Sequence, residues 1–501
     1  LLRINNRELK IKRYIMNKIS CFLPYAGKEQ VEKTVNSLQA TGLIEEIRLI
    51  TTDATLESLP DCEILFVDMP YSSATLKAIA NAAKGEYTLL YTKETTLEMG
   101  MFALERMIHI LEDSSAGMVY ADHYQIADGK QSNAPVIDYQ FGSLRDDFNF
   151  GSLLLFNTEK LKEAAGHMKS DYNFAGLYDL RLKLSQHSNL VHINEYLYSE
   201  VENDTRKSGE KIFDYVDPKN RDRQIEMEQA CTEHLKEIGG YLAPEFKKIE
   251  FSAGNFEYEA SVIIPVRNRI RTIRDAIKSV LMQKTDFKYN LIIIDNHSTD
   301  GTTEAIDEFK DDERVIHIIP ERTDLGIGGC WNMGVHHPKC GKFAVQLDSD
   351  DVYKDENTLA IMVRAFYEQN CAMVVGTYMM TDFNMNMIAP GIIDHKEWTP
   401  ANGRNNALRI NGLGAPRAFY TPVLREVKVP NTSYGEDYAL GLNFSRQYQI
   451  GRVYDVVYLC RRWDDNSDAS LDIVKMNGHN LYKDRIRTWE LQARIAMNKN
   501  K

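Results

Sequence analysis

The stretch FAVQLDSDDVY (Phe343–Tyr353) is a short apolar run that ends in acidic residues. Asp348, Asp350 and Asp351 follow its last apolar residue, Leu347. In an open α/β sheet, ligands bind outside the carboxyl ends of the strands, so these carboxylates lie where a ligand is expected. Carboxylate oxygens suit Mg²⁺ or Mn²⁺, and such an ion can bridge to a diphosphate. Because Asp and Ser are also ordinary turn residues, the surrounding sequence must decide between a metal site and a polar turn.

Composition predicts a globular protein with two domains. The chain has 501 residues, more than the roughly 250–300 at which one core stops growing. Its net charge of −12 argues against duplex nucleic acid as a partner. No apolar run approaches the roughly 18 residues of a membrane helix, and no signal peptide is visible. We therefore expect a cytoplasmic protein with no transmembrane segment. Peripheral membrane contact and a homodimer are both compatible with this expectation.

Residues 259–460 alternate β-rich runs with helical patterns, which predicts βαβ units and a largely parallel sheet. A helix is expected over 272–282, where apolar residues recur at helical spacing. The expected strands are 261–266, 290–295, 315–319, 343–347 and 372–377.

The N-terminal half repeats this sequence rhythm. Four blocks align in the same order in the two halves, which favours an internal duplication over chance similarity. The aligned pairs start at 19 and 260, then cover 85–94 and 341–350, 151–164 and 414–427, and 176–185 and 436–445.

The expected organisation of the chain has five parts. A helix over 220–238, stopped by Gly239 and Gly240, is expected within the segment that joins the two halves. The parts are an extension (1–16), a first domain (17–200), a linker with a helix (201–258), a second domain (259–470) and a C-terminal helix (471–501).

The C-terminal half resembles the family 2 glycosyltransferases, which have the GT-A fold. The resemblance rests on five ordered motifs: SVIIPVRNR (261–269), IIIDNHSTDGT (292–302), GIGGCWNMG (326–334), LDSDD (347–351) and GEDYAL (435–440). Together with the duplication, it implies an α/β protein with two tandem GT-A-like domains, each Rossmann-like with a mostly parallel sheet.

The resemblance also implies contacts to a nucleotide-sugar donor. Carboxylates accept hydrogen bonds from base N–H groups, and Arg pairs with phosphates. The glycines of 326–334 suit either close approach to the nucleotide or packing at a helix start, and Asp300 is expected to cap a helix. The implied donor contacts are Pro265, Arg267, Asn268, Asp295, Asn332, Asp348, Arg461 and Arg462.

Asp348 and Asp350 match the Asp-x-Asp motif of the family, in which the acids hold the donor ribose and a divalent metal. The resemblance implies Asp350 as the direct ligand of Mn²⁺ or Mg²⁺ and Asp348 as the ribose or second metal contact. Asp351 is expected to cap the following helix. Trp463 stands where the family often has a His ligand, and His479 is a remote substitute.

Asp437 is implied as the catalytic base, with Glu436 as its supporting neighbour. An acceptor hydroxyl is a weak nucleophile until a carboxylate takes its proton. Acids at a helix start are also stabilised by the helix dipole, so the series of motifs carries this assignment.

The alignment predicts that the N-terminal domain is degenerate. Thr92 and Glu94 stand opposite Asp348 and Asp350, while Gly176 and Leu177 stand opposite Glu436 and Asp437. Leu cannot accept a proton, and one acid makes a poor metal site. This domain is expected to hold the acceptor or an oligomer interface.

The expected activity is inverting, metal-dependent transfer of a sugar from a UDP- or GDP-linked donor to a hydroxyl of a glycan or related acceptor, in polysaccharide or glycoconjugate synthesis. One alternative is a non-catalytic sugar-binding or nucleotide-binding scaffold. Another is a sugar-phosphate nucleotidyltransferase, which needs a Gly-rich loop after the first strand. Residues 266–269 contain no glycine, which disfavours that class.

Overall fold

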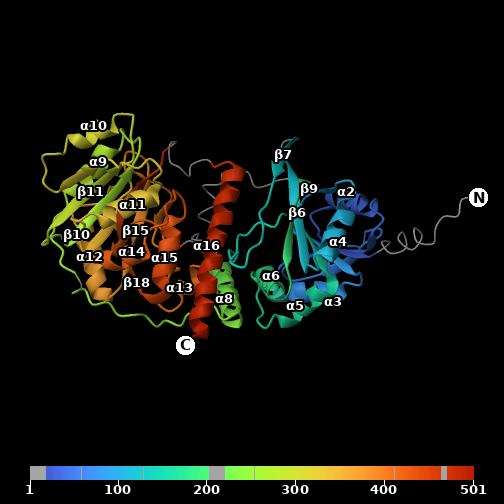
Figure 1. Ribbon diagram of the computed structural model, residues 1–501. Coiled ribbons are helices and arrows are strands. Elements are labelled where there is room, and N and C mark those ends of the chain that lie inside the picture. The colour runs from blue at the N-terminus through green and yellow to red at the C-terminus, as the bar shows by residue number, and fades with distance from the viewer. Residues whose placement is uncertain are drawn as a thin grey trace, which may run out of the picture. The chain divides into compact units, whose positions relative to one another are not determined.

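A computed structural model describes residues 18–57, 59–127, 129–201, 221–252, 254–410, 412–463 and 471–500. The predicted extension, 1–16, lies outside them. The described chain forms two compact units (Figure 1). The first contains everything up to 201, residues 221–239 and 472–488, and the second contains 240–463, 471 and 489–500.

The first unit is built on a mixed sheet. β1 to β4 are mutually parallel, and β8 enters antiparallel to both β4 and β6. The strand order is β3-β2-β1-β4-β8-β6-β9-β5, with β7 paired to β6. The strands are β1 (Ile19–Pro24), β2 (Ile44–Thr51), β3 (Glu63–Phe66), β4 (Tyr87–Tyr91), β5 (Leu97–Met99), β6 (Met118–Ala127), β7 (Lys130–Ala134), β8 (Leu153–Asn157) and β9 (Leu190–Val201).

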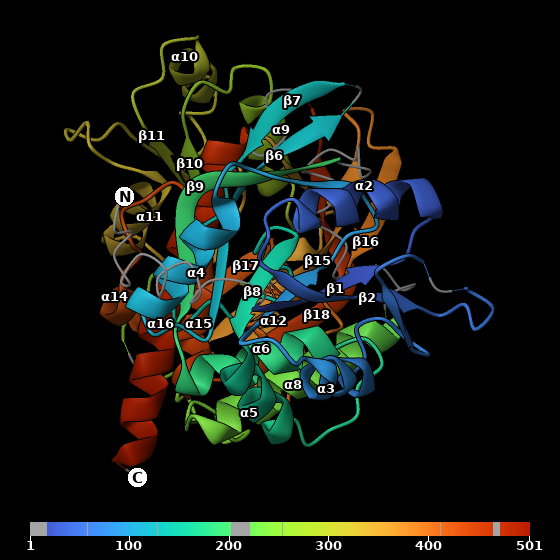
Figure 2. The same cartoon turned by 90° about the vertical axis from the view of Figure 1, so that its right-hand side faces the viewer.

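Helices cover both faces of this sheet because its strands are apolar on both sides. Cys21 and Leu23 pack with α2 and α4, while Phe22 between them packs with α3, α5 and α6 on the opposite face. Figure 2 shows α3, α5, α6 and α8 grouped together. The helices are α2 (Lys28–Gln39), α3 (Ser73–Ala82), α4 (Ala103–Asp113), α5 (Thr158–His167), α6 (Gly176–His187) and α8 (Arg221–Glu237). Helix α8 forms where a helix was expected over 220–238.

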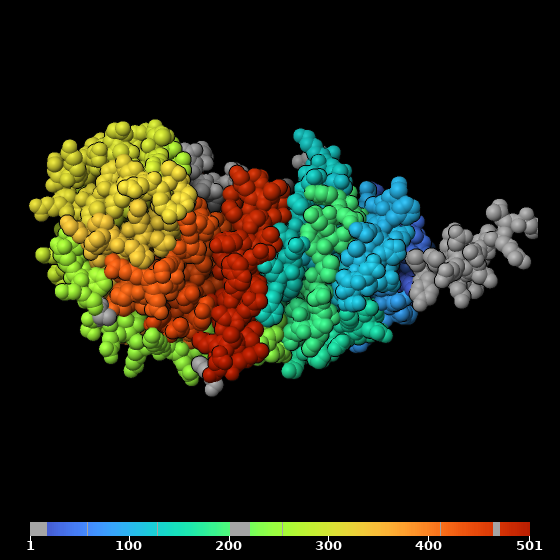
Figure 3. Space-filling model, in the orientation of Figure 1, coloured from blue at the N-terminus to red at the C-terminus, as the bar shows by residue number. Residues whose placement is uncertain are grey.

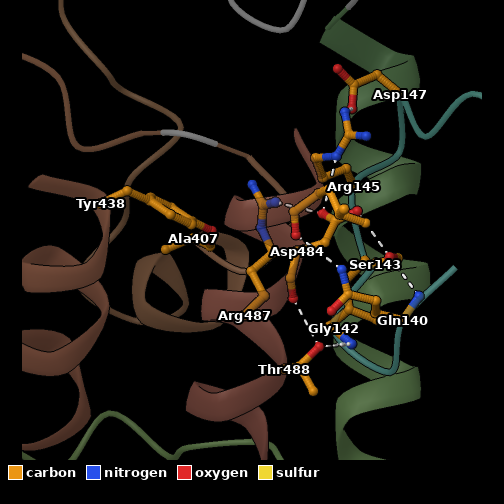
Figure 4. Close-up of polar contacts among 12 residues, drawn as sticks. Gln140, Gly142, Ser143, Arg145, Asp147, Ala407, Tyr438, Asp484, Arg487 and Thr488 are labelled. Atoms are coloured by element: carbon orange, nitrogen blue, oxygen red, sulfur yellow. Dashed lines mark hydrogen bonds and ion pairs between the residues drawn. The ribbon is translucent and has the colours of Figure 1, made fainter. Parts of the chain in front are cut away.

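A buried polar cluster joins the loop before β8 to the last helix, α16 (Ile473–Lys499) (Figure 4). Asp484 accepts a hydrogen bond from the Ser143 hydroxyl at 2.9 Å and lies 3.2 Å from Arg145 Nε. The Gly142 N–H donates to Thr488 Oγ1 at 2.9 Å. The atoms of α16 are coloured red in Figure 3. The hydrogen bonds from Gly142 and Ser143 to α16 hold the loop at 142–145 in place.

The second unit has the same strand order, β12-β11-β10-β13-β17-β15-β18-β14, with β16 paired to β15. Its strands are β10 (Ala260–Val266), β11 (Tyr289–Asp295), β12 (Val315–Ile318), β13 (Phe343–Gln346), β14 (Val352–Tyr353), β15 (Met373–Thr381), β16 (Met387–Ile393), β17 (Arg417–Tyr420) and β18 (Ile450–Arg461). Its helices are α9 (Ile273–Leu281), α10 (Thr302–Asp307), α11 (Ile327–His336), α12 (Thr358–Gln369), α13 (Gly403–Asn406), α14 (Thr421–Val427) and α15 (Glu436–Gln447).

The expected α/β architecture is confirmed. β10 to β13 run parallel, and each of the five expected strands lies within a few residues of its expected bounds. β17 is antiparallel to β13 and β15, so the sheet is more mixed than expected beyond β13. In the part of the chain that the structure describes, no helix is long and apolar enough to cross a bilayer.

Candidate active site

Three neighbouring strands of the second unit bring the sequence motifs to one edge of its sheet. β10 lies between β11 and β13, and all three are parallel. Val266 pairs with Asp295, while Ile263 pairs with Gln346 two residues before Asp348. Because the carboxyl ends of parallel strands meet at one edge, the first, second and fourth motifs adjoin where an open α/β sheet binds ligands.

The acids that follow β13 form a crowded, largely buried group. Burial raises the pKa of Asp348, and the charge of Asp350 raises it further. Burial also raises the pKa of Asp351 well above its usual range, with Asp350 and Asp348 adding to the effect. The Asp350 side chain is 17% exposed and lies 3.7 Å from Arg269. A cation beside Asp350 would relieve this mutual repulsion.

The structure places Asp351 differently from the sequence expectation. The following helix, α12, begins at Thr358, with Asn357 at its N-cap. Asp351 instead accepts a hydrogen bond from the Arg461 N–H at 2.8 Å. The expected capping role is therefore wrong, because β14 separates Asp351 from the helix.

Arg461 is buried beneath the acidic turn. Its Nε donates to the Asp350 carbonyl at 2.6 Å, and its Nη1 donates to Asp275 at 2.8 Å. The neighbouring Arg462 N–H donates to the Thr381 carbonyl at 2.8 Å. This arrangement supports the backbone of the Asp350 turn, and the phosphate contact implied for both arginines stays a prediction.

Asp295 is fully buried at the end of β11. Burial alone would raise its pKa, but hydrogen bonds from His317, Ser298 and Thr303 outweigh that effect and hold the pKa well below its usual range. The Ser298 N–H donates at 3.1 Å and the Thr303 hydroxyl at 2.5 Å. The carboxylate is thus charged and fixed in orientation at the strand end.

The turn after β10 is held by the loop that follows β11. The Asn268 N–H donates to Ser298 Oγ at 3.0 Å, and Asn268 Oδ1 accepts from the Thr299 N–H at 2.8 Å. Asn268 has a φ of 55°, in the left-handed region that Asn tolerates. Arg267 beside it is exposed, so its guanidinium is available to a ligand. Asp300 accepts from the Thr302 N–H at 3.0 Å, although Gly301, and not Asp300, is the N-cap of α10.

The glycine segment packs a helix start against a loop. A Cβ at Gly328 would clash with the Pro430 carbonyl oxygen, so only glycine fits there. Asn332, in α11, donates to the Val429 carbonyl at 2.7 Å and accepts from its N–H at 2.9 Å. Packing at a helix start, one of the two roles expected for these glycines, is therefore confirmed. A nucleotide contact of Asn332 stays a prediction.

Glu436 and Asp437 begin α15 directly after Gly435, whose φ is 78°. Burial, followed by the charge of Asp437, raises the pKa of Glu436 to about 8. The Asp437 side chain is 34% exposed, and its Oδ2 lies 2.5 Å from Arg417 Nη1. Glu436 therefore favours its uncharged form, whereas Asp437 is ion-paired with Arg417 and partly exposed.

A buried arginine connects the two acidic groups. Arg417 Nε donates to Gln346 Oε1 at 3.0 Å, and Gln346 Nε2 donates to Asp348 Oδ1 at 2.9 Å. Burial alone would lower the pKa of Arg417, but Asp437 and Asp348 raise it. An unbroken chain of contacts thus runs from Asp437 through Arg417 and Gln346 to Asp348.

Sequence reasoning missed Arg417 and Gln346. The signal for Arg417 was a charged residue inside GAPRAFY, a run that aligns with the apolar GSLLLFN of the first half. A charge that interrupts a buried strand needs a partner. The sequence could not identify that partner, because Asp437 is twenty residues away along the chain.

The corresponding strand end of the first unit contains an internal ion pair. Lys93, opposite Ser349 in the alignment, lies 2.8 Å from Glu200, and the buried His123 lies 2.9 Å from the same carboxylate. Burial alone would raise the pKa of Glu200, but His123 and Lys93 lower it to about 2. Glu94 is exposed. Lys93 therefore supplies a positive charge where the second unit has clustered acids.

Asp350 and Asp348 fit a divalent cation that also binds substrate. Within the described residues, no group of three or more His, Cys, Asp and Glu side chains is arranged to hold a metal ion. Mg²⁺ is commonly held by one or two carboxylates together with substrate phosphates, so two acids suffice for such a site. His479 belongs to the part of α16 in the first unit.

Comparison with known proteins finds a family model that matches part of the second unit. Residues 261–418 match the family model described as "Glycosyl transferase family 2". This match lies within the C-terminal half and confirms the resemblance predicted from its motifs.

Individual relatives agree with this class. An "Uncharacterized glycosyltransferase" of Rickettsia felis is 37% identical over 198 residues, which is 39% of this chain and 31% of that protein. "Glycosyltransferase GlyG" of Streptococcus pneumoniae is 27% identical over 122 residues, which is 24% of this chain and 40% of that protein. The chain therefore spans less than half the length of these curated relatives. The family match and these relatives support a glycosyltransferase.

Among solved structures, the chain is similar to S. aureus TarS 1–349 in complex with UDP-GlcNAc. The sequence identity is 18% and the TM-score is 0.37, with 47% of this chain and 72% of that chain covered.

Proposed function

We propose that the second unit transfers a sugar from a nucleotide-diphosphate donor, UDP- or GDP-linked, to a hydroxyl of a glycan or glycoconjugate acceptor, with inversion at the anomeric carbon. The observation that carries this proposal is the chain of contacts from Asp437 through Arg417 and Gln346 to Asp348. It holds a base candidate and the acidic turn after β13 in one fixed arrangement.

Asp437 is the proposed general base. Its partly exposed carboxylate can reach an acceptor hydroxyl, and a carboxylate that takes the proton as the bond forms accelerates transfer by roughly 10²- to 10⁴-fold. Glu436 is the supporting neighbour, because burial and the charge of Asp437 raise its pKa and favour its uncharged form beside the Asp437 carboxylate. Arg417 orients Asp437 and balances its charge.

Asp350 and Asp348 would hold Mn²⁺ or Mg²⁺. When bound, the ion neutralises charge on the departing diphosphate. Arg267, exposed beside Asn268, is placed to contact the same phosphates, and Asp295 presents a fixed carboxylate to the base of the donor. Pro265, Asn332, Arg461 and Arg462 complete the proposed donor site, the last three through the loops and turns that they support.

The first unit is proposed to be a degenerate repeat of the second. The identical strand order supports this, as does the Lys93 ion pair in place of clustered acids. We propose that the chain divides into a first domain (17–200), a linker with a helix (201–258) and a second domain (259–470). Acceptor binding and a homodimer interface are its proposed uses.

A donor-release assay tests the proposal. Purified full-length protein is incubated with UDP-sugars and GDP-sugars, with Mn²⁺ or with EDTA, and free nucleotide diphosphate is measured. We expect release from one donor class with Mn²⁺ and little with EDTA. Binding of glycans without release from any donor would instead favour a non-catalytic scaffold.

Arg417→Gln is expected to lower turnover by about 10²-fold, because it leaves Asp437 and Asp348 without their shared cation. The effect should fall on kcat more than on the KM for donor. Arg425→Gln is the matched control, since Arg425 donates to the carbonyls of Val335 and His337 and, among the described residues, to no carboxylate. Steady-state kinetics of both folded variants check this, and equal turnover in the two would contradict the role of Arg417.

A further inference from the structure

The first unit contains a cavity of about 320 Å³ that the proposed transfer reaction does not use. Its walls come from β6, β8, α6 and α8 and from the loops at 69–71 and 146–150. A volume of this size is at the lower end of the roughly 300–1,000 Å³ typical of small-molecule sites. The loop at 146–150 continues from the segment that the Asp484 cluster holds, so this wall is fixed.

Aromatic side chains dominate the lining, and their polar atoms are already engaged. The Tyr71 hydroxyl donates to the Thr92 carbonyl at 2.5 Å, and the Tyr178 hydroxyl donates to the Leu144 carbonyl at 2.6 Å. A sugar would need several hydrogen bonds that these groups do not offer. The cavity therefore suits an apolar ligand body. The aromatic lining residues are Tyr71, Phe148, Phe150, Phe156, Phe174 and Tyr178.

The cavity lies at the place in the fold that corresponds to the catalytic centre of the second unit. Thr92 and Leu177 both line it, and they align with Asp348 and Asp437. Thr92 follows β4 at the carboxyl edge of the sheet, where open α/β sheets bind ligands. The aligned positions therefore have acids in the second unit but a hydroxyl and an apolar side chain in the first.

Two arginines, Arg181 and Arg223, and one acid, Asp146, line the cavity, so its charged lining is net positive. Arg181 is buried, donates to the Ser143 carbonyl at 3.2 Å and to the Arg145 carbonyl, and lies 4.7 Å from the centre of the Tyr178 ring. Among the residues described, no carboxylate lies within ion-pair distance of it. Arg223, on α8, is exposed at the cavity wall. A buried cation without a carboxylate favours an anion as its partner.

We propose that this cavity binds a small amphipathic anion, with an alkyl, isoprenoid or aryl body against the aromatic walls and one phosphate or carboxylate group directed to Arg181 and Arg223. Such a ligand can be the apolar end of a lipid-linked acceptor or a free carboxylic acid. The site is independent of the transfer chemistry proposed for the second unit.

Fluorescence titration of the full-length protein tests the proposal. The probes are the anionic 1-anilinonaphthalene-8-sulfonate and its neutral analogue N-phenyl-1-naphthylamine. We expect one site for the anionic probe, weakened about fivefold by Arg223→Gln, with a smaller effect on the neutral probe. Arg221→Gln, an exposed change on the same helix outside the cavity, should leave both affinities unchanged.

Leu177→Phe fills part of the cavity and should weaken both probes about tenfold, in protein whose circular dichroism and thermal melting match wild type. If it melts early, Phe174→Ala, at a partly exposed lining position, should still weaken both probes. Unchanged affinity in a folded lining variant would overturn the proposal.

Displacement of the anionic probe distinguishes the sources of the ligand. If geranyl phosphate displaces the probe at a lower concentration than decanoate does, the ligand is a lipid-linked phosphate. The reverse order indicates a carboxylic acid. The proposal would be contradicted if methyl glucoside displaced the probe while geranyl phosphate and decanoate did not. Asp437→Asn should leave the titration unchanged, so failure of the proposed transferase activity and failure of this site are separable.

Discussion

Asp437→Asn is expected to reduce the rate of sugar transfer by about 10²- to 10⁴-fold, because the amide cannot accept the acceptor proton. Asn keeps the size of the side chain, and its amide oxygen can still accept from Arg417. Donor binding in the presence of Mn²⁺ should therefore stay close to that of wild type. Steady-state transfer rates and calorimetric titration with the nucleotide diphosphate measure the two quantities separately.

The matched control is Asp455→Asn, on an exposed position of β18. It removes the same charge from the same unit without touching α15, so turnover should be unchanged. Retained turnover in Asp437→Asn would remove Asp437 from the mechanism. Loss of donor binding together with turnover would show that its role is structural.

Asp350→Ala is expected to abolish metal-dependent donor binding and to reduce turnover by about 10²-fold or more, because the metal would lose its proposed direct ligand. The change also leaves Arg269 without the acid 3.7 Å away. Titration of the nucleotide diphosphate with and without Mn²⁺ measures the loss, and added Mn²⁺ should not strengthen binding to the variant.

Glu94→Ala supplies the matched control because Glu94 occupies the aligned position in the first unit. It is exposed, and the strand end there contains the Lys93–Glu200 ion pair. Turnover and donor affinity should stay near wild type. A large loss of turnover in Glu94→Ala would reveal a second active site and contradict the degenerate assignment.

Much of the fold followed from buried apolar runs. The strands of 261–266 and 290–295 are buried along nearly their whole length, so they are mostly apolar, and Pro265 and Asp295 mark their ends. β17 was harder to predict, since Arg417 interrupts its apolar pattern and its antiparallel pairing depends on strands distant in sequence.

The candidate residues came from motifs, each contained in one short stretch of sequence. Asp348, Asp350 and Asp437 were assigned because their stretches resemble those of the family 2 glycosyltransferases. The partners were not, because Arg417 meets Asp437 and Arg461 meets the Asp350 turn only through folding. Asp351 was assigned to the wrong partner for the same reason, since Arg461 is distant in sequence.

One measurement tests the central claim most directly: a crystal of the full-length protein soaked with Mn²⁺ and, in separate experiments, UDP-sugars and GDP-sugars. The account predicts density for the metal beside Asp350 and Asp348, with the diphosphate of one donor class bound to it and Asp437 facing the anomeric carbon. A nucleotide bound at the Thr92 end of the first unit, or metal bound away from Asp350 in the second, would contradict it.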